Sequence, residues 1–162
     1  MSPSARGTLD WRPAAAHPAL LAPAVAAAIG AVPEALVAPI DASLADTAAF
    51  CEAYDVALSA SANCVIVAGR RGDDVRTAAV MVLATHRADV NGVVRRRLDA
   101  RKASFAPMDD AVRDTGMEFG GITPIGLPGW PILVDDAVAD AGEVVVGAGI
   151  RGAKLLVPAA AL

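Results

Sequence analysis

The chain has 162 residues, a formal net charge of −4 and 55% hydrophobic residues, of which few are aromatic. This length suits one domain with a substantial core, built mainly from alanine and valine. The acidic balance argues against a broad basic face for nucleic acid but leaves room for a local one.

Short apolar runs and sparse metal-ligand residues exclude further classes. No run approaches the roughly 18 apolar residues of a membrane span, and the alanine-rich stretch 19–29 lacks the basic flank of a signal peptide. Cys51 and Cys64 have no metal-type spacing and are expected to be reduced. His17 and His86 are too scattered for a metal site. We therefore expect a cytoplasmic protein with no metal, no cofactor and no membrane partner.

The chain order predicts a single domain over residues 1–162 that begins with an arm. Residues 1–7 are expected to be disordered, and residues 9–13, which include an apolar Leu-x-Trp, are expected to lie against the body. Residues 1–17 together would then be an extended or flexible arm.

The first regular elements follow the arm. The pattern predicts a helix at 18–29 and a short strand at 34–40. A second helix is expected to open at 41–43, with Ser43 and Asp46 as a capping pair.

A hairpin is predicted in the middle of the chain. The apolar strand 63–68, the polar turn 70–74 and the returning strand 75–84 form this unit. Asp89 then caps a third helix. The apolar face expected for that helix carries Val90, Val93, Val94 and Leu98.

The last third of the chain alternates strands with one helix. A strand is predicted at 102–105, and a fourth helix begins at Pro107 and ends at Gly116. Three more strands are expected at 131–134, 143–146 and 154–157. Hairpins mixed with helices predict an α/β fold whose sheet is mixed and largely antiparallel.

The segment from Gly116 to Pro128 holds four glycines and two prolines among apolar residues. Glycine permits φ > 0 and close approach to the main chain, whereas proline restricts φ. We expect a loop of defined shape, docked by Ile122 and Ile125, whose N–H groups can bind a carbonyl or an oxyanion. The alternative is a tight connection between two elements.

Five segments carry a resemblance to a known family. They are 63–68, 101–106 (Arg-Lys-Ala-Ser-Phe-Ala), 115–126 with Gly-Gly-Ile-Thr-Pro, 134–135 and 147–152. In this order they resemble the YbaK-like family, the domain also found in or beside prolyl-tRNA synthetase. The Gly-Gly-Ile-Thr-Pro segment is the most specific of them.

The resemblance implies a barrel-like mixed sheet with flanking helices and a metal-free active site. It implies an aminoacyl-tRNA deacylase that acts in trans on the ester of a mischarged small amino acid, on tRNA of the proline type. The partner would be the 3′ end of the aminoacyl-tRNA. The catalytic positions would be Gly120, Gly121, Ile122, Thr123 and Pro124.

The main-chain chemistry of this loop fits ester hydrolysis. N–H groups of Gly120, Gly121 and Ile122 would stabilise the developing oxyanion, and one such donor typically lowers a barrier by about 3 kcal/mol. Thr123 would bond the substrate or cap the turn. No Ser-His-Asp or Cys-His set is evident in the sequence, so no covalent nucleophile is indicated.

The substrate-binding positions include one departure from the family. The resemblance implies a lysine, usual in the family, at the position of Asn63, or of Ala62 if the register slips by one, and asparagine cannot make charge-assisted bonds. Lys102 would replace that lysine if its strand neighbours Asn63; otherwise it is a solvated edge residue. Asp135 would hold the glycine loop or cap a turn. The remaining positions are Gly116, Gly147 and Gly149, of which the last two belong to a turn that borders the family's pocket.

Two alternatives stay open. The basic cluster of 95–97 with 101–102 is either solvated and ion-paired or contacts tRNA. The whole chain is either a deacylase or a non-catalytic relative that binds an aminoacyl or nucleotide end, or a protein partner. A monomer and a weak dimer both suit the sequence.

Overall fold

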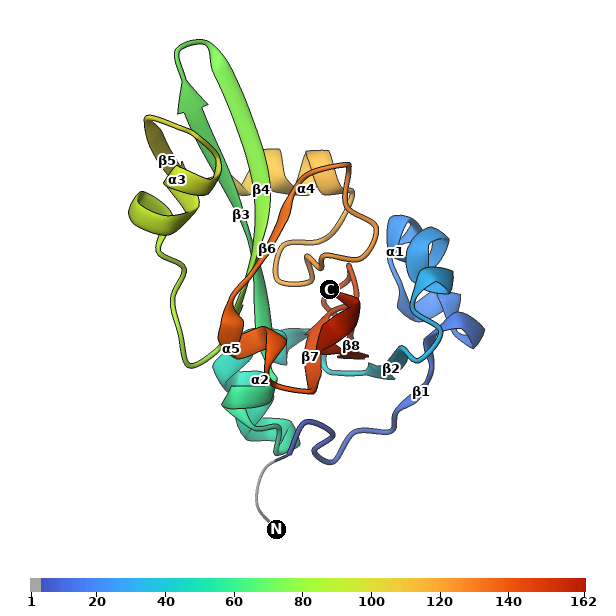
Figure 1. The fold of residues 1–162 in the computed structure, drawn as a ribbon. Helices are drawn as coiled ribbons and strands as arrows, with labels where there is room; N and C mark the ends of the chain where they lie inside the picture. Colours follow the sequence, from blue (N-terminus) through green and yellow to red (C-terminus); the bar gives the residue numbers. More distant parts are fainter. Residues whose placement is uncertain (1–3) are drawn as a thin grey trace.

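The computed structural model describes residues 4–162, and two four-stranded sheets form its centre (Figure 1). In the first sheet the strand order is β1-β2-β8-β7 and every pair is antiparallel. Its strands are β1 (Arg12–Pro13), β2 (Leu36–Pro39), β8 (Ala153–Pro158) and β7 (Glu143–Gly147).

The second sheet has the order β5-β3-β4-β6, with β4 and β6 as its one parallel pair. An isolated bridge between Ser61 and Val145 links it to the first sheet. The expected α/β class, with a mixed and largely antiparallel sheet, is confirmed. The strands are β5 (Lys102–Phe105), β3 (Ala62–Arg71), β4 (Asp74–Leu83) and β6 (Ile132–Val134).

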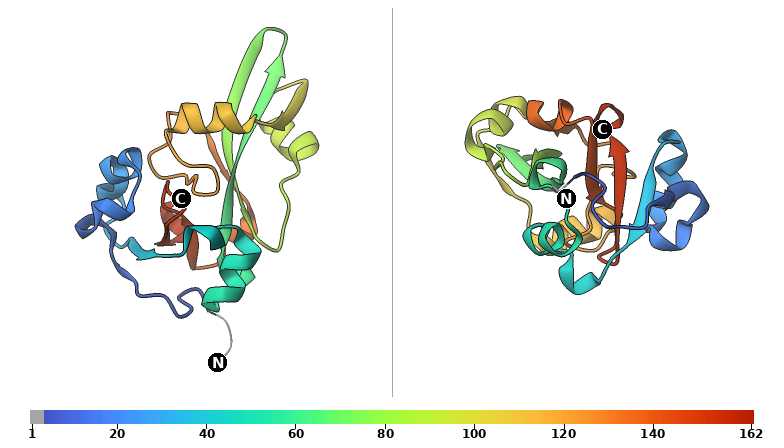
Figure 2. Two further views of the ribbon diagram at one scale, coloured as in Figure 1. Left: turned by 180° about the vertical axis from the view of Figure 1, so that it is seen from behind. Right: turned by 90° about the horizontal axis from the view of Figure 1, so that it is seen from below.

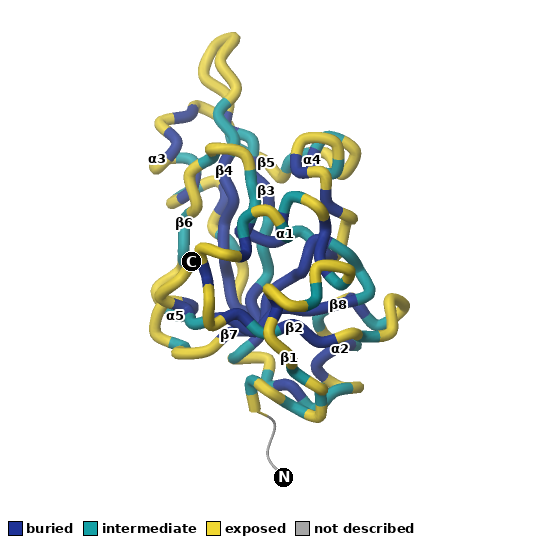
Figure 3. The backbone as a smooth tube through the Cα atoms, turned by 90° about the vertical axis from the view of Figure 1, so that its right-hand side faces the viewer, coloured by how far each residue is buried: buried dark blue, intermediate teal, exposed yellow. Residues whose placement is uncertain are grey.

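The β3–β4 hairpin is the longest feature of the molecule, and its outer half projects from the body as an exposed tip (Figure 3). Its register runs from Ala62 opposite Leu83 to Arg71 opposite Asp74. Gly72 has φ +60° at the first central position of the two-residue turn, where a type II′ turn requires glycine. The hairpin lies where the sequence predicts it, with longer strands.

The N-terminal helices lie beside the C-terminal strands (Figure 2), and the main core joins them to both sheets. Val25 of α1 (Pro23–Ala28) packs in the same buried cluster as Met81 of β4 and Leu155 of β8. Burying such side chains contributes about 1.5–3 kcal/mol each. The core thus depends on contacts between residues far apart in the sequence.

The helix expected at 18–29 is broken. A 3-10 turn at Pro18–Leu20 precedes α1, and a second at Ile29–Ala31 follows it. Pro23 has no N–H and pushes Ala22 into an extended conformation, with φ −61° and ψ 152°, so the helix restarts at Pro23.

The second helix starts later than expected. Asp41 caps only a 3-10 turn, Ala42–Leu44, by accepting from the N–H of Ser43 at 2.9 Å. The pair of Ser43 with Asp46 does not form, because Asp46 is extended and α2 (Thr47–Tyr54) begins after it. The side chain that caps is therefore that of Asp41, two residues before Ser43, and it caps the 3-10 turn instead of α2.

Asp89 does cap the third helical segment, by accepting from the N–H groups of Gly92 and Val93. The segment is a π-helical turn, Val90–Val94, that continues into the short α3 (Arg95–Arg97). Because a π turn is wider than an α turn, Val93 leaves the apolar face and is 49% exposed. The rest of the predicted face, Val90, Val94 and Leu98, is buried.

The fourth helix follows the prediction. α4 (Met108–Thr115) starts after Pro107 and ends at Gly116, whose φ of +68° is the left-handed conformation of a helix terminus. The short α5 (Asp136–Ala139) was not predicted. Among residues 4–162, no helix combines the length and the hydrophobicity that a membrane crossing requires.

The N-terminal arm lies against the body. Residues 4–7, which were expected to be disordered, are held against the body because the carbonyl of Ser4 accepts a hydrogen bond from the N–H of Ala57 at 2.9 Å. The indole Nε1 of Trp11 donates to the carbonyl of Arg6 at 2.8 Å, and β1 then pairs with β2. The rest of the expected disordered segment, Met1 to Pro3, lies outside the described residues.

Candidate active site

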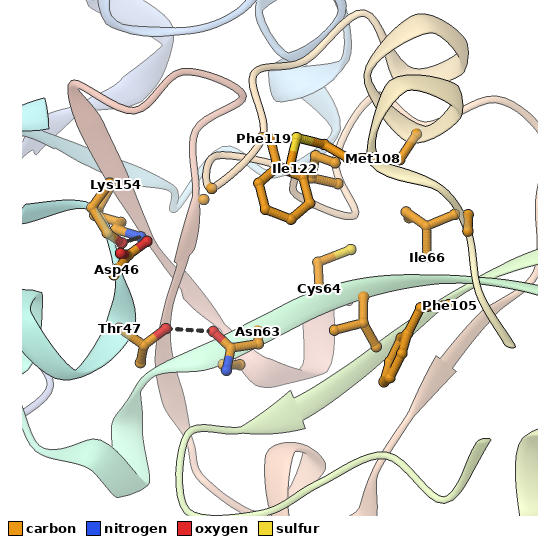
Figure 4. A pocket seen from close by; sticks show the side chains of 17 residues that line it. Asp46, Thr47, Asn63, Cys64, Ile66, Phe105, Met108, Phe119, Ile122 and Lys154 are labelled. Atoms are coloured by element: carbon orange, nitrogen blue, oxygen red, sulfur yellow. Dashed lines mark hydrogen bonds between the residues drawn. The ribbon is translucent and has the colours of Figure 1, made fainter. Parts of the chain in front are cut away.

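A cavity of about 370 Å³ opens beside the first half of β3 (Figure 4). Strand β5 pairs with β3 only from Val67 onward, and the N–H of Ala106 bonds to the carbonyl of Ile66, so the edge of residues 62–65 is free of β5 and helps to form one wall. The start of α2, the start of α4 and the glycine loop surround this edge. The residues that line the cavity include Asp46, Thr47, Asn63, Cys64, Ile66, Phe105, Met108, Ala111, Phe119, Gly120, Ile122, Gly147 and Lys154.

The glycine loop contributes Gly120 and Ile122 to the cavity wall. Within residues 4–162, neither of their N–H groups donates a hydrogen bond. The N–H of Gly121, in contrast, donates to the carbonyl of Glu118 at 2.9 Å. Two of the three donors predicted for this loop therefore have no partner within the described chain, and the third is consumed within the loop.

Thr123 and Pro124 lie behind this wall. Both are buried and neither lines the cavity, and the Thr123 hydroxyl has no hydrogen-bond partner in the described part of the chain. These two residues therefore support the loop from the core side. The placement of Thr123 does not favour a direct contact with substrate, and its unpartnered hydroxyl does not cap the turn either.

Close packing explains why the loop needs glycine. A Cβ on Gly121 would lie 2.7 Å from the backbone of Ile150, and a Cβ on Gly147 of β7 would collide with the carbonyl of Gly121. Gly120 has φ +89°, which side chains rarely adopt. Arg151 adds two anchors, from its N–H to the carboxylate of Glu118 at 2.7 Å and from its guanidinium to the carbonyl of Phe119 at 3.1 Å.

The wall opposite the loop is polar. Thr47 Oγ1 donates to Asn63 Oδ1 at 2.6 Å, which ties the first residue of α2 to β3 (Figure 4). Lys154 reaches the cavity from β8, and its Nζ donates to the carbonyl of Ala45 at 3.2 Å and lies 5.1 Å from the centre of the Phe50 ring. Burial lowers the pKa of this ammonium. The cavity thus contains a buried cation that the sequence prediction did not include.

Comparison with known proteins decides the family. A family model described as the aminoacyl-tRNA editing domain matches residues 41–162. The chain belongs to this family.

Solved structures share the fold of this editing domain. A candidate trans-editing enzyme for prolyl tRNA synthetase is 19% identical, with a TM-score of 0.70 over 85% of this chain and 88% of the other. A hypothetical protein, APE2540, is 21% identical, with a TM-score of 0.64 over 75% of this chain and 76% of the other. A computationally designed epitope scaffold is 20% identical, with a TM-score of 0.69 over 85% and 88%. No curated protein sequence matches.

The editing domain's cavity also contains a thiol. Although part of Cys64 is accessible, the surrounding side chains shield its sulfur, and this burial raises the pKa of the thiol to about 12. A thiol with so high a pKa is neutral at physiological pH and is a poor nucleophile. No histidine lines the cavity, and no three metal-ligating side chains are grouped within residues 4–162.

Two of the predicted substrate-binding residues lie elsewhere in the editing domain. Lys102 pairs with Arg70, seven residues or about 23 Å along β3 from Asn63, so it cannot replace the family lysine. Asp135 caps α5 by accepting from the N–H of Ala137, which is the turn-capping alternative.

The glycines divide between wall and support. Gly147 lines the cavity. Gly149 lies behind the loop, where its N–H donates to the carbonyl of Gly121 at 2.7 Å. Gly116 ends α4 and does not line the cavity. Of the six predicted substrate-binding positions, the structure brings Asn63 and Gly147 to the cavity.

An apolar rim surrounds the mouth of the cavity. Phe105, Met108 and Phe119 are each at least half exposed and come from β5, from α4 and from the glycine loop. Exposed aromatic rings beside a cavity provide faces on which a nucleobase can stack.

The sequence around Lys154 contains a pattern that points to a buried lysine. Lys154 is a single charged residue at the start of an otherwise apolar strand, Lys-Leu-Leu-Val-Pro. A lysine within a buried strand must find partners for its ammonium. The local pattern does not say, however, which cavity those partners surround.

Proposed function

We propose that the protein is a trans-editing aminoacyl-tRNA deacylase. Its substrate is a small amino acid esterified to the wrong tRNA, of the proline type, in the cytoplasm. The observation that carries the proposal is the pair of unused N–H groups of Gly120 and Ile122 in the cavity wall. The membership of residues 41–162 in the aminoacyl-tRNA editing family supports it.

The loop supplies the electrostatic part of the reaction. When the oxygen of water bonds to the ester carbon, the carbonyl oxygen becomes an oxyanion, which the two N–H groups stabilise. The C–O bond to the ribose then breaks, and the ribose oxygen takes up the proton that the attacking water has lost, which gives the free amino acid and a ribose hydroxyl. Each donor is worth about 3 kcal/mol in such a site, because the glycine loop is held in place before the substrate binds.

Lys154 supplies the positive charge that Asn63 lacks. Its ammonium has three donors, one of which is bonded to the carbonyl of Ala45. A remaining donor can bind a phosphate or ribose oxygen of the terminal nucleotide, and a bond from a charged donor is about twice as strong as a neutral one. Asn63 remains a neutral binding group beside it.

The cavity walls favour a small acyl side chain. Cys64, Ile66, Ala111 and Ile122 provide short apolar side chains around the volume of about 370 Å³. Ligand cavities usually range from about 300 to 1,000 Å³, so this one lies near the lower end. Shared with a ribose, it leaves little space for a large side chain.

A panel of mischarged tRNAs tests the function. We expect ester loss well above the uncatalysed rate for at least one small amino acid, such as alanine or cysteine on tRNA for proline. Correctly charged prolyl-tRNA is the control and should be hydrolysed more slowly. Absence of accelerated ester loss for every member would contradict the proposal.

The second candidate is a non-catalytic relative that keeps the cavity. The observation that favours it is Asn63 in place of the family lysine. Such a protein would bind an aminoacyl or nucleotide end without hydrolysing the ester. Tight binding of a non-hydrolysable aminoacyl-nucleotide analogue, together with no turnover on the panel, would support this candidate instead.

A further inference from the structure

A second cavity, of about 510 Å³, lies along the edge strand β5 beside α3. Four of its lining residues are cations: Arg70 from β3, Arg95 from α3, and Arg101 and Lys102 at the start of β5. No aspartate or glutamate lines it. We call this cavity, with its four cations, the basic groove.

The four cations have no acidic partners. Within residues 4–162, no salt bridge involves any of them. The nearby arginines differ, since Arg71 and Arg76 both pair with Asp99. The basic groove therefore keeps its charge in a protein whose net charge is −4.

A third cavity shows that this arrangement is specific. It lies beside β6, at the opposite edge of the same sheet, and there Arg87 and Arg97 are accompanied by Asp89, Asp135 and Asp136. Mixed charges of this kind do not select a polyanion. The unbalanced charge in the basic groove does, because it attracts a ligand with several negative charges.

The basic groove and the active-site cavity share two strands. On β5, Lys102 lies in the groove and Phe105 lines the cavity, three residues or about 10 Å away. On β3, Arg70 and Ile66 are divided in the same way. A strand of nucleic acid whose 3′ end enters the cavity can therefore continue over the groove.

We propose that the basic groove binds the ribose-phosphate backbone of the tRNA acceptor end. This inference rests on the proposed function, since it needs the 3′ end to occupy the active-site cavity. Each cation that neutralises a phosphate releases counterions, so this binding weakens as salt rises. The groove would give affinity for tRNA irrespective of its sequence, while the cavity selects the amino acid.

Binding of uncharged tRNA at several KCl concentrations tests the groove directly. The test variant is Arg101→Ala with Lys102→Ala, because both residues are exposed. The matched control is Arg6→Ala with Arg12→Ala, which removes the same charge from the N-terminal arm. We expect the test variant to bind at least about tenfold more weakly at moderate salt, with a log–log salt slope shallower by about 1.5–2.

The control should stay within about threefold of the wild type. An unchanged affinity in the test variant, or an equal loss in the control, would overturn the inference. So would equally tight binding of poly-glutamate with the same sensitivity to the test variant, which would indicate an acidic protein partner. Thermal unfolding of both variants checks that neither loses its fold.

A kinetic comparison separates this inference from the proposed function. If the enzyme is active, the test variant should lose at least about tenfold more kcat/KM on full-length mischarged tRNA than on an aminoacylated CCA trinucleotide. If the protein hydrolyses neither substrate, the proposed function fails, whereas the binding of uncharged tRNA still decides the groove. Equal losses on both substrates would count against the groove.

Discussion

Lys154 and Asn63 both line the cavity, and the resemblance to the family predicts that Asn63 stands where its members have a lysine. Lys154 arrives from β8, ninety-one residues later in the chain, and is held by the carbonyl of Ala45. The structure thus brings a lysine from β8 and Asn63 from β3 to the same cavity. Charge in a binding site depends on where the ammonium lies, and strands from different sheets can supply it.

A charge-swap experiment tests this interpretation. Lys154→Met should lower the deacylation rate about 10- to 100-fold, because a hydrogen bond from a charged donor is worth about 1.5–3 kcal/mol. Adding Asn63→Lys to the same variant should restore part of the activity by returning a cation to the cavity. The deacylation rates on mischarged tRNA are measured for Lys154→Met, for Asn63→Lys and for the double variant.

Two outcomes would contradict this interpretation. An unchanged rate in Lys154→Met would show that the lysine has no role in the reaction. Loss of activity with no restoration in the double variant, while both proteins show wild-type thermal unfolding, would show that a cation on β3 does not serve in this chain.

At the scale of elements, the glycine loop is held against the β7–β8 turn by backbone contacts. Gly121 does not have a positive φ; it needs glycine because Ile150 leaves no space for a Cβ. Gly120 is the residue with φ +89°. The sequence predicts that the loop needs glycines. The structure shows that Gly121 is required because a Cβ has no space there, and Gly120 because its φ is positive.

Two alanine substitutions, one in the glycine loop and one directly after it, distinguish a packed glycine from a free one. Gly121→Ala should displace the loop, lower the deacylation rate at least about tenfold and destabilise the protein by about 1–3 kcal/mol. Gly129→Ala is the control, since nothing lies within 4 Å of a Cβ there, and it should be neutral or slightly stabilising. Activity and urea denaturation are measured for both, and equal behaviour would contradict the packing argument.

At the scale of the whole molecule, the arm, the helices and both sheets share buried clusters. The largest cluster links α1 with β4, β7 and β8, and another links Leu9 and Trp11 of the arm with Phe50 of α2. Because the elements cannot bury these surfaces separately, we expect residues 1–162 to unfold as one cooperative unit.

The two tryptophans report on this unit from different places. Trp11 lies in the arm, and Trp130 packs against the buried cluster that contains Ile66 of β3. In single-tryptophan proteins made by Trp130→Phe and Trp11→Phe, fluorescence should give the same urea midpoint, in agreement with far-UV circular dichroism. An earlier transition for Trp11 alone would show instead that the arm is a separate, weakly held segment.

Features that depend on short stretches of chain could be predicted from the sequence alone. Asp89 caps its helix, Gly72 turns the hairpin and Gly116 ends α4, because each effect needs only neighbouring residues. Alternating hairpins and helices predicted the fold class, and the Gly-Gly-Ile-Thr-Pro segment indicated the family to which residues 41–162 belong.

Features that depend on contacts between residues far apart in the sequence became evident only from the tertiary structure. It placed Lys154 in the cavity and Lys102 outside it, because the pairing of β3 with β5 and β8 with β2 sets which side chains converge. It also showed that the N–H of Gly121 is consumed while those of Gly120 and Ile122 are not. Hydrogen-bond partners and steric neighbours across the fold are not encoded in any local pattern, so these parts of the site could be assigned only once the chain was folded.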